Sequence, residues 1–227
     1  MKISVITLFP EMFLSPFNES IIKRAIEKKL IEIEFINIRT FGIGKHQLVD
    51  DTPYGGGMGM VLRVDVLHKA IEKVKSEKLT TKEQKVILLT AHGKTFNQKK
   101  AKNFSKLKHL ILICGHYEGF DERVKKYIDE EISIGDFVLT GGEIPAMLII
   151  DSVSRLVEGV ISKGSLDTES FSPFLEYPQY TKPQEYDGLK VPNILLSGNH
   201  PKINQWRTLK SQTITKKLRP DLLNNKG

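Results

Sequence analysis

The chain has 227 residues, of which 40% are hydrophobic and 27% charged, a composition typical of a globular protein with a real core. No apolar run approaches the roughly 18 residues that a membrane-spanning helix needs, so we expect no membrane insertion. The apolar start at residues 2–8 is too short for a signal peptide. The single cysteine, Cys114, excludes an intrachain disulfide and fits a reducing compartment, so we expect a cytoplasmic protein.

The formal net charge of +7 is concentrated near the C-terminus. Residues 176–227 contain nine Lys or Arg against four Asp or Glu, a net +5, whereas the first 175 residues contain 25 against 23, a net +2. A basic tail on a nearly neutral body suggests a polyanionic partner. Basic chains that bind nothing acidic are also common, so charge alone leaves nucleic-acid binding open.

Strand-like and helix-like hydrophobic patterns alternate along the chain. They predict a strand at 2–8, a helix at 20–30, a strand at 31–36, a helix capped by Asp65, a strand at 86–89, a helix at 98–107, a strand at 110–114 and a helix at 144–157. Continuous apolar runs are typical of strands that are covered on both faces. The alternation therefore predicts an α/β domain with a mostly parallel sheet and helices on both faces.

The last third of the chain has a different character. Residues 162–172 are polar and typical of a linker or mobile loop, and four prolines between 173 and 192 predict extended chain. Residues 201–218 then have a helical pattern. We therefore expect a domain at 1–161, a flexible linker or active-site loop at 162–175, and a small, mainly helical C-terminal domain at 176–227.

Four glycine-rich turns occur, at 53–59, 114–119, 134–136 and 139–143, and three of them follow strand-like runs. Ligands of open α/β sheets bind where loops leave the carboxyl ends of strands, and glycine lets the backbone approach a ligand closely. A single such turn needs no more explanation than a tight bend. Three of them close together in the chain favour a binding cleft.

Other site types have no support in the sequence. No P-loop fingerprint, dinucleotide G-x-G-x-x-G after a strand or G-x-S-x-G elbow occurs. The six histidines have no ligand spacing, which argues against a zinc site, and we predict no metal-binding residues.

Arg155 ends the polar cluster D-S-V-S-R in an apolar helix, where it either needs a partner in a cleft or lies in solvent at the helix end. Asp167 and Glu169 lie in the polar loop, where solubility alone would explain them.

Seven sequence blocks follow one another in a distinctive order. They are F-P-E-M-F at 9–13, V-D-D-x-P-Y-G-G-G-x-G-M at 49–60, C-G-x-Y-E-G-x-D-E-R-V at 114–124, I-D-E-E-x-S-I-G-D at 128–136, V-L-T-G-G-E-I-P-A-M at 138–147, D-S-V-S-R at 151–155 and L-L-S-G-N-H at 195–200. Trp206 and Arg207 follow. Nearly end to end, this order resembles the tRNA (guanine-37-N1)-methyltransferases of the SPOUT superfamily, the knotted methyltransferases.

The resemblance implies a deep trefoil knot around residues 85–160 and an obligate homodimer with its active sites between the two chains. It implies that S-adenosylmethionine binds in the knot loops and that the tail domain grips tRNA. The implied cofactor residues are Leu88, Leu89, Thr90, Ala91, Gly115, Tyr117, Glu118, Ile134, Gly135, Asp136, Phe137, Val138, Leu139, Gly141, Gly142 and Pro145. The residues expected to contact RNA phosphates are Lys202, Arg207, Lys210, Lys216, Lys217 and Arg219.

The implied reaction methylates N1 of the guanosine next to the anticodon. N1 carries a proton that a carboxylate must remove, and Arg155 would stabilise the charge that develops on O6. The family usually places an aspartate directly before Ser-Phe, whereas this chain has Glu169 there and Asp167 two residues earlier. Either carboxylate is a candidate base, and position favours Glu169.

Two alternatives remain at this stage, a knotted ribose 2′-O-methyltransferase and a non-catalytic RNA-binding relative. The blocks at 114–124 and 151–155 argue against the first, while the glutamate in place of aspartate leaves the second open. The sequence does not indicate the preferred tRNAs. Mg²⁺ is left open as an assisting ion without an identifiable protein site.

Overall fold

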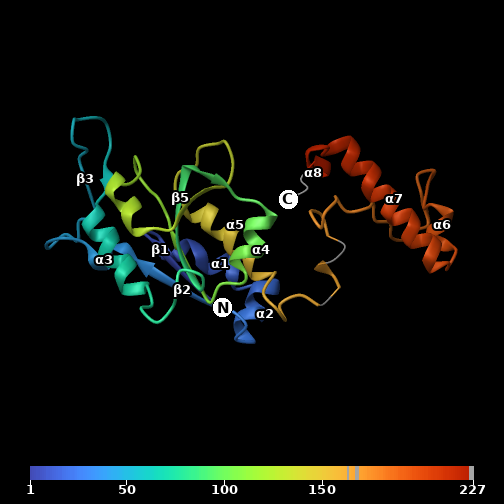
Figure 1. The fold of residues 1–227 in the computed structure, drawn as a ribbon, viewed down its shortest axis with the longest axis horizontal. Helices are drawn as coiled ribbons and strands as arrows, with labels where there is room; N and C mark the ends of the chain where they lie inside the picture. Colours follow the sequence, from blue (N-terminus) through green and yellow to red (C-terminus); the bar gives the residue numbers. More distant parts are fainter. Residues whose placement is uncertain (163, 167–168, 225–227) are drawn as a thin grey trace. The chain divides into compact units, whose positions relative to one another are not determined.

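The structure, a computed structural model, describes residues 1–162, 164–166 and 169–224. The chain divides into two compact units, Met1–Ile161 and Ser162–Gly227 (Figure 1). Asp167, one of the two candidate bases, lies outside the described residues. No helix in the described part of the chain is long and apolar enough to cross a membrane.

A five-stranded sheet with the order β2-β1-β6-β5-β7 forms the centre of unit 1, and all of its strand pairs are parallel. Its strands are β1 (Lys2–Thr7), β2 (Glu32–Asn37), β5 (Gln84–Thr95), β6 (His109–Ile113) and β7 (Glu130–Ser133). A separate antiparallel pair joins β3 (Asp50–Asp51) to β4 (Val61–Leu62). The predicted parallel sheet is confirmed, whereas the trefoil knot stays a prediction.

Helices cover both faces of this sheet, as predicted. Along β6, Leu110 and Leu112 pack into one core cluster and Ile111 and Ile113 into the other, because successive side chains of a strand point to opposite faces. The first cluster includes residues of α1 (Leu14–Phe17), α2 (Ser20–Glu27), α4 (Gln98–Phe104) and α5 (Glu143–Ser154). The second includes residues of α3 (Val64–Val74). Three short 3-10 helices, η1 (Pro10–Phe13), η2 (Ile38–Phe41) and η3 (Glu122–Tyr127), complete the unit.

Asp65 was predicted to cap a helix, and this prediction is wrong. Helix α3 begins at Val64, its N-cap residue is Arg63, and no side chain caps it. The Asp65 carboxylate instead pairs with the Arg63 guanidinium at 3.0 Å, within the first turn of the helix. Asp65 lies inside the helix, one residue after its start, where its carboxylate also accepts a hydrogen bond from the Val66 N–H at 3.1 Å. The helices predicted at 20–30, 98–107 and 144–157 are shorter in the structure, and Arg155 is the C-cap of the last one.

Strand β5 extends well beyond the predicted 86–89. Its pairing with β7 shifts register between Leu89 and Lys94, so the strand is irregular where it leaves the sheet. A Cβ at Gly93 would lie only 2.4 Å from the Ile132 backbone nitrogen, so glycine is required for this close approach. The extended strand carries the segment after Leu89 over the end of β7.

Unit 2 is built around α7 (His200–Leu218), which confirms the predicted helix at 201–218. The Asn199 side chain accepts a hydrogen bond from the Lys202 N–H, and Pro201 lies in the first turn, two features that favour helix initiation. Helices α6 (Asn193–Leu196) and α8 (Asp221–Asn224) flank it. The proline-rich segment includes a hairpin that we did not predict, β8 (Glu185–Tyr186) and β9 (Leu189–Lys190). The two residues between these strands are Asp187 and Gly188, and an Asp-Gly pair in this position favours a hairpin.

Candidate cofactor-binding site

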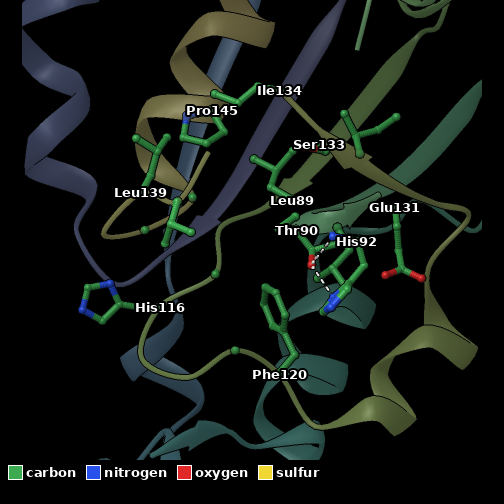
Figure 2. Close-up of a pocket in the computed structure, with 18 of the residues that line it drawn as sticks. Leu89, Thr90, His92, His116, Phe120, Glu131, Ser133, Ile134, Leu139 and Pro145 are labelled. Atoms are coloured by element: carbon green, nitrogen blue, oxygen red, sulfur yellow. Dashed lines mark hydrogen bonds between the residues drawn. The ribbon is translucent and has the colours of Figure 1, made fainter. Parts of the chain in front are cut away.

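A cavity of about 360 Å³ lies where the parallel strands of unit 1 end (Figure 2). Its lining comes from residues 88–92 within β5, 115–122 with 124 and 125 after β6, 131–135 at the end of β7, 137–142 in the loop that follows, and Pro145. In open α/β sheets, ligands bind at this edge. The volume lies within the usual range of small-molecule sites, about 300–1,000 Å³.

The glycine-rich turns that follow the strands are brought together at this cavity. All of the residues predicted for the cofactor line it except Asp136. Sequence reasoning missed several lining side chains that flank those turns, among them His92, His116, Phe120, Glu131 and Ser133. Their nearness in sequence to the glycine turns was the available signal. That the lining residues bind a cofactor stays a prediction.

Two of these turns touch each other directly. The Gly142 N–H donates to the Gly115 carbonyl at 2.8 Å, and a Cβ at Gly142 would lie 2.6 Å from the Cys114 Cα. A Cβ at Gly115 would lie 2.8 Å from the Phe120 ring. Glycine is therefore required for the loop before α5 to close against the end of β6.

A buried carboxylate lies behind these loops. Glu143, the first residue of α5, is 3% exposed, and one of its oxygens accepts a hydrogen bond from the Thr7 hydroxyl at 2.7 Å. The positive end of the helix dipole favours a carboxylate in this position. Burial raises the pKa of the adjacent Cys114 thiol well above its ordinary value, and the Glu143 charge raises it further. Cys114 is therefore a protonated, buried thiol behind the cavity.

The cavity combines apolar and polar surfaces. Leu139 and Pro145 lie toward one side of it, the polar side chains of His92 and Glu131 lie toward the other, and Leu89 lies between them (Figure 2). Such a lining suits a ligand with one apolar part and one charged part.

The first glycine-rich turn, 53–59, lies beside the loop after β6, although none of its residues lines the cavity. The Glu118 N–H donates to the Met60 carbonyl at 3.0 Å, and the Leu62 N–H donates to the Gly119 carbonyl at 2.9 Å. A Cβ at Gly59 would lie 2.5 Å from the Glu118 side chain. This turn therefore packs directly against a residue that lines the cavity.

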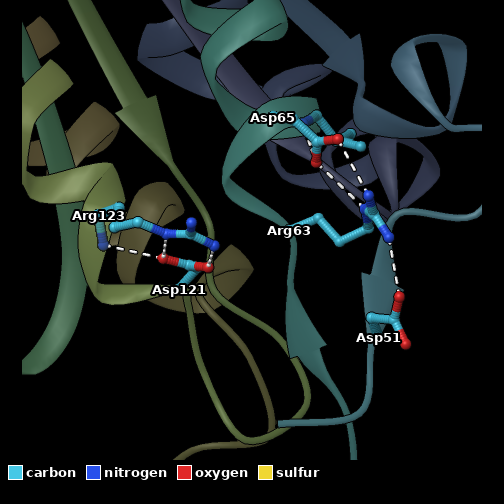
Figure 3. A network of polar contacts seen from close by, with 6 residues as sticks. Asp51, Arg63, Asp65, Asp121 and Arg123 are labelled. Atoms are coloured by element: carbon cyan, nitrogen blue, oxygen red, sulfur yellow. Dashed lines mark hydrogen bonds and ion pairs between the residues drawn. The ribbon is translucent and has the colours of Figure 1, made fainter. Parts of the chain in front are cut away.

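Charged side chains near the loop after β6 and the adjacent strands β3 and β4 form ion pairs with one another (Figure 3). The Asp121 carboxylate accepts from the Arg123 backbone N–H at 2.9 Å and pairs with the Arg123 guanidinium at 2.6 Å, which lowers the Asp121 pKa. Arg63 bridges Asp51 and Asp65 at 2.8 and 3.0 Å. Asp121 and Arg123, from the sequence block at 114–124, thus hold the turn into η3.

The family model described as tRNA (Guanine-1)-methyltransferase TrmD matches residues 1–225. The chain belongs to this family. A tRNA (guanine-N(1)-)-methyltransferase of Dictyoglomus turgidum is 54% identical over 98% of this chain and 90% of the relative. Proteins of the same name from Clostridium botulinum (strain Hall) and Clostridium beijerinckii are 56% and 55% identical, each over 98% of this chain and over 91% and 92% of the relatives.

The predicted catalytic residues of this family member lie outside the cavity lining or in the other unit. Arg155, half-buried at the C-terminal end of α5, does not line the cavity. Glu169 is half-buried and belongs to unit 2. The catalytic roles of both residues remain predictions.

The basic residues predicted to contact RNA lie on or directly after α7. Lys202, Lys210, Lys216 and Lys217 are exposed on the helix. The Arg207 guanidinium lies 5.0 Å from the centre of the Tyr177 ring, and the Lys210 ammonium lies 5.8 Å from the centre of the Trp206 ring. Both pairs have cation–π geometry, which fixes the cations next to aromatic faces.

No group of three or more potential metal-ligating His, Cys, Asp or Glu side chains occurs among the residues that the structure describes.

Proposed function

We propose that this chain transfers a methyl group from S-adenosylmethionine to N1 of the guanosine at position 37 of tRNA, next to the anticodon. The main support is the cavity formed by the glycine turns, in a chain 56% identical to a protein named tRNA (guanine-N(1)-)-methyltransferase. An enzyme of this class requires a methyl donor and an RNA base in one site.

The lining of the cavity fits this methyl donor. The apolar side chains of Leu89, Ile134 and Leu139 would cover the flat adenine ring, and backbone groups of the Gly115 and Gly141 turns would bind its polar edge. The carboxylates of Glu118 and Glu131 line the same cavity and would favour a cationic ligand. When bound, S-adenosylmethionine supplies an electrophilic methyl group on a positively charged sulfonium.

The chain's own residues would then manage the proton and charge of the guanine. As N1 takes the methyl group, whose bond to the donor sulfur breaks so that a neutral thioether leaves, the N1 proton would pass to the Glu169 carboxylate. General-base catalysis of this kind contributes typically about 10²–10⁴-fold. The Arg155 guanidinium, with its fixed fork of donors, stabilises the negative charge that develops on O6. Asp167 is the alternative proton acceptor.

We also propose that the active protein is a homodimer, as the resemblance implies. Large apolar side chains are exposed near the cavity, including Val138 (94% exposed) and Phe137 (56% exposed) in its lining. Helix α5 also exposes Ile144 and Leu148, on the side that does not pack into the core. A second copy of the chain would cover this surface.

The exposed lysines of α7 support the proposal that unit 2 binds tRNA through phosphate contacts.

A tRNA substrate and a free cysteine fit the cytoplasm, where we propose the protein acts. A role for Mg²⁺ would be tested by methylation in the presence of EDTA.

Single-turnover methylation of an unmodified tRNA transcript tests the function, and nucleoside mass spectrometry shows whether the methyl group is on the base or the ribose. We expect Glu169→Gln to lower the rate about 10²-fold or more, because an amide cannot accept the proton, with cofactor affinity nearly unchanged. Glu169→Asp should retain activity, and Asp167→Asn, the matched control, should be mild.

The outcomes separate the alternatives. An inactive Asp167→Asn variant with an active Glu169→Gln variant would make Asp167 the base. Wild-type protein that binds tRNA but forms no methylated guanosine would support the non-catalytic relative, and a methylated ribose would support the 2′-O-methyltransferase.

A further inference from the structure

We propose that Ser211 and Thr215 of α7 are positioning residues for methyl transfer, because they hold the segment that follows the proposed base, Glu169. The inference rests on the proposed function, since it takes Glu169 as the proton acceptor. It gives α7 a second task beside the phosphate contacts proposed for its lysines, which is to fix the loop that carries the base.

Side chains of α7 bind both backbone groups of Leu175. The Leu175 N–H donates to the Thr215 hydroxyl at 2.8 Å, and the Leu175 carbonyl accepts a hydrogen bond from the Ser211 hydroxyl at 2.6 Å. The Thr215 hydroxyl in turn donates to the Ser211 carbonyl at 2.8 Å. A single residue of the loop is thus held at both of its hydrogen-bonding groups, as a residue of a paired β-strand is.

The two hydroxyl groups lie where no other group replaces them easily. Ser211 and Thr215 are four residues apart, so they lie on the same side of α7. Thr215 is fully buried, and Ser211 and Leu175 are half-buried. Because an unpaired N–H or carbonyl away from water is costly, loss of the two hydroxyl groups should shift Leu175 toward solvent.

Further contacts connect this anchor to the neighbourhood of Glu169. The Glu176 N–H donates to the hydroxyl of Ser170, the residue directly after Glu169, at 3.1 Å. The Phe171 N–H donates to the Phe174 carbonyl at 2.8 Å. The Phe171 backbone has φ +69°, an unfavourable angle for a bulky residue that persists only where surrounding contacts impose it. The backbone next to Glu169 is therefore tied to the anchored segment.

The same helix carries cations that are proposed to contact RNA. Lys216 and Lys217 are exposed on α7, next in sequence to the buried Thr215. Directly after the helix, the Arg219 guanidinium lies 5.8 Å from the centre of the Phe171 ring, which adds a cation–π contact to the loop. An RNA bound to α7 would therefore meet a base whose loop is already fixed, and such preorganisation is what a positioned proton acceptor requires.

The test removes the two hydroxyl groups with little change in side-chain volume, in a variant with Ser211→Ala and Thr215→Val. A displacement of about 1 Å at a reaction site costs up to roughly 10²-fold in rate, so the single-turnover rate at saturating tRNA and cofactor should fall about 10- to 100-fold. The dissociation constants of tRNA and S-adenosylmethionine should change less than about twofold. Thr215→Ser, which keeps the hydroxyl group, should retain most of the rate.

A matched control removes two other hydroxyl groups from the same helix. Thr208 and Thr213 are exposed, and each hydroxyl donates to the carbonyl four residues earlier, as the Thr215 hydroxyl also does. A variant with Thr208→Val and Thr213→Val loses this kind of hydrogen bond but keeps the anchor of Leu175. It should methylate tRNA at the wild-type rate.

A double-mutant cycle with Glu169→Gln separates positioning of the base from a general loss of structure. If Ser211 and Thr215 act through Glu169, their substitution in the Glu169→Gln background should lower the rate by less than about threefold, because the group that they position is already absent. A general loss of structure would instead multiply the two effects. Thr215→Val alone, which loses one of the two anchoring bonds, gives the same comparison where the double substitution prevents folding.

Three results would overturn the inference. One is a wild-type rate in the variant that lacks both anchoring hydroxyl groups, and another is an equal loss of rate in the Thr208 and Thr213 control. The third is full multiplication of the two effects in the Glu169→Gln background. Failure of the proposed function is distinguishable, because the wild-type protein would then form no methylated guanosine or Glu169→Gln would be fully active, and the inference would fall with it.

Discussion

Substitution of Gly142 by alanine tests how the cavity is built. The Gly142 backbone has φ −84° and ψ −4°, angles that alanine adopts without strain, so the effect of the change is purely steric. The added Cβ would lie 2.6 Å from both the Cys114 Cα and the Gly115 nitrogen, whereas ordinary contacts begin at 3.4 Å. The difference, 3.4 minus 2.6, requires a shift of about 0.8 Å between two backbone segments, neither of which has a flexible side chain to move aside.

The magnitude follows from this shift. Overpacking of a filled site costs about 1–3 kcal/mol, so the free energy of unfolding should fall by that amount. The displaced loop lines the cavity, and a loss of about 1.4 kcal/mol in binding corresponds to a tenfold weaker cofactor affinity. A displacement of about 1 Å in a reaction site costs up to roughly 10²-fold in rate. We therefore expect cofactor binding to weaken about tenfold and single-turnover methylation to slow about 10- to 100-fold.

Urea unfolding, calorimetry with S-adenosylmethionine and single-turnover methylation measure the three quantities. The matched control is Gly44→Ala, since Gly44 has φ +69° and an added Cβ would meet nothing within 4 Å. Its left-handed backbone costs alanine about 1–2 kcal/mol, a similar loss of stability at a position outside the cavity lining. Wild-type cofactor affinity in Gly142→Ala would refute the idea that contact between the two turns shapes the cavity.

Two further predictions follow from the structure. The buried His109, hydrogen-bonded to Ser4 and Gln84 at 2.9 Å each, has a pKa below its ordinary 6.5 because burial disfavours its charged form. The unfolded chain therefore binds the proton more readily than the folded chain. The free energy of unfolding that depends on His109 is fully present above about pH 6.5 and falls below it, by at most about 1.4 kcal/mol per pH unit. In urea titrations, His109→Gln should flatten this acid limb, and a limb as steep as in wild type would contradict the assignment. Leu148, 42% exposed on α5, should lie in the homodimer interface, so Leu148→Glu should give monomers in sedimentation experiments. The control Leu218→Glu, at a side chain 63% exposed on α7, should leave the dimer intact. A dimeric Leu148→Glu protein would place the interface elsewhere.

Much of the fold could be predicted because the signals are local. Continuous apolar runs such as 110–114 identify strands covered on both faces, and a helical period identifies α2 and α3. The element types therefore follow from side-chain periodicity, which needs no knowledge of distant contacts. Helix ends were less accurate, since they depend on a few competing hydrogen bonds and ion pairs, as the pairing of Asp65 with Arg63 shows.

The candidate site was predictable for a related reason. Glycines that follow strands identify cavity loops because the carboxyl ends of parallel strands share one edge of the sheet. Side chains such as Phe120 and Glu131 have only the weaker signal of lying near those turns in the sequence, since whether they line the cavity depends on the tertiary packing of strands and loops.

The sequence by itself determined the parallel α/β architecture, the family and the set of glycine loops. Only the tertiary structure decided that Gly142 closes on Gly115, that Thr7 bonds to Glu143 across 136 residues of chain, and that Lys94 pairs with Ile132 at the cavity. The physical reason is that such contacts depend on strand register and loop closure. These are settled by the packing of the whole domain, and no local pattern of residue types records them.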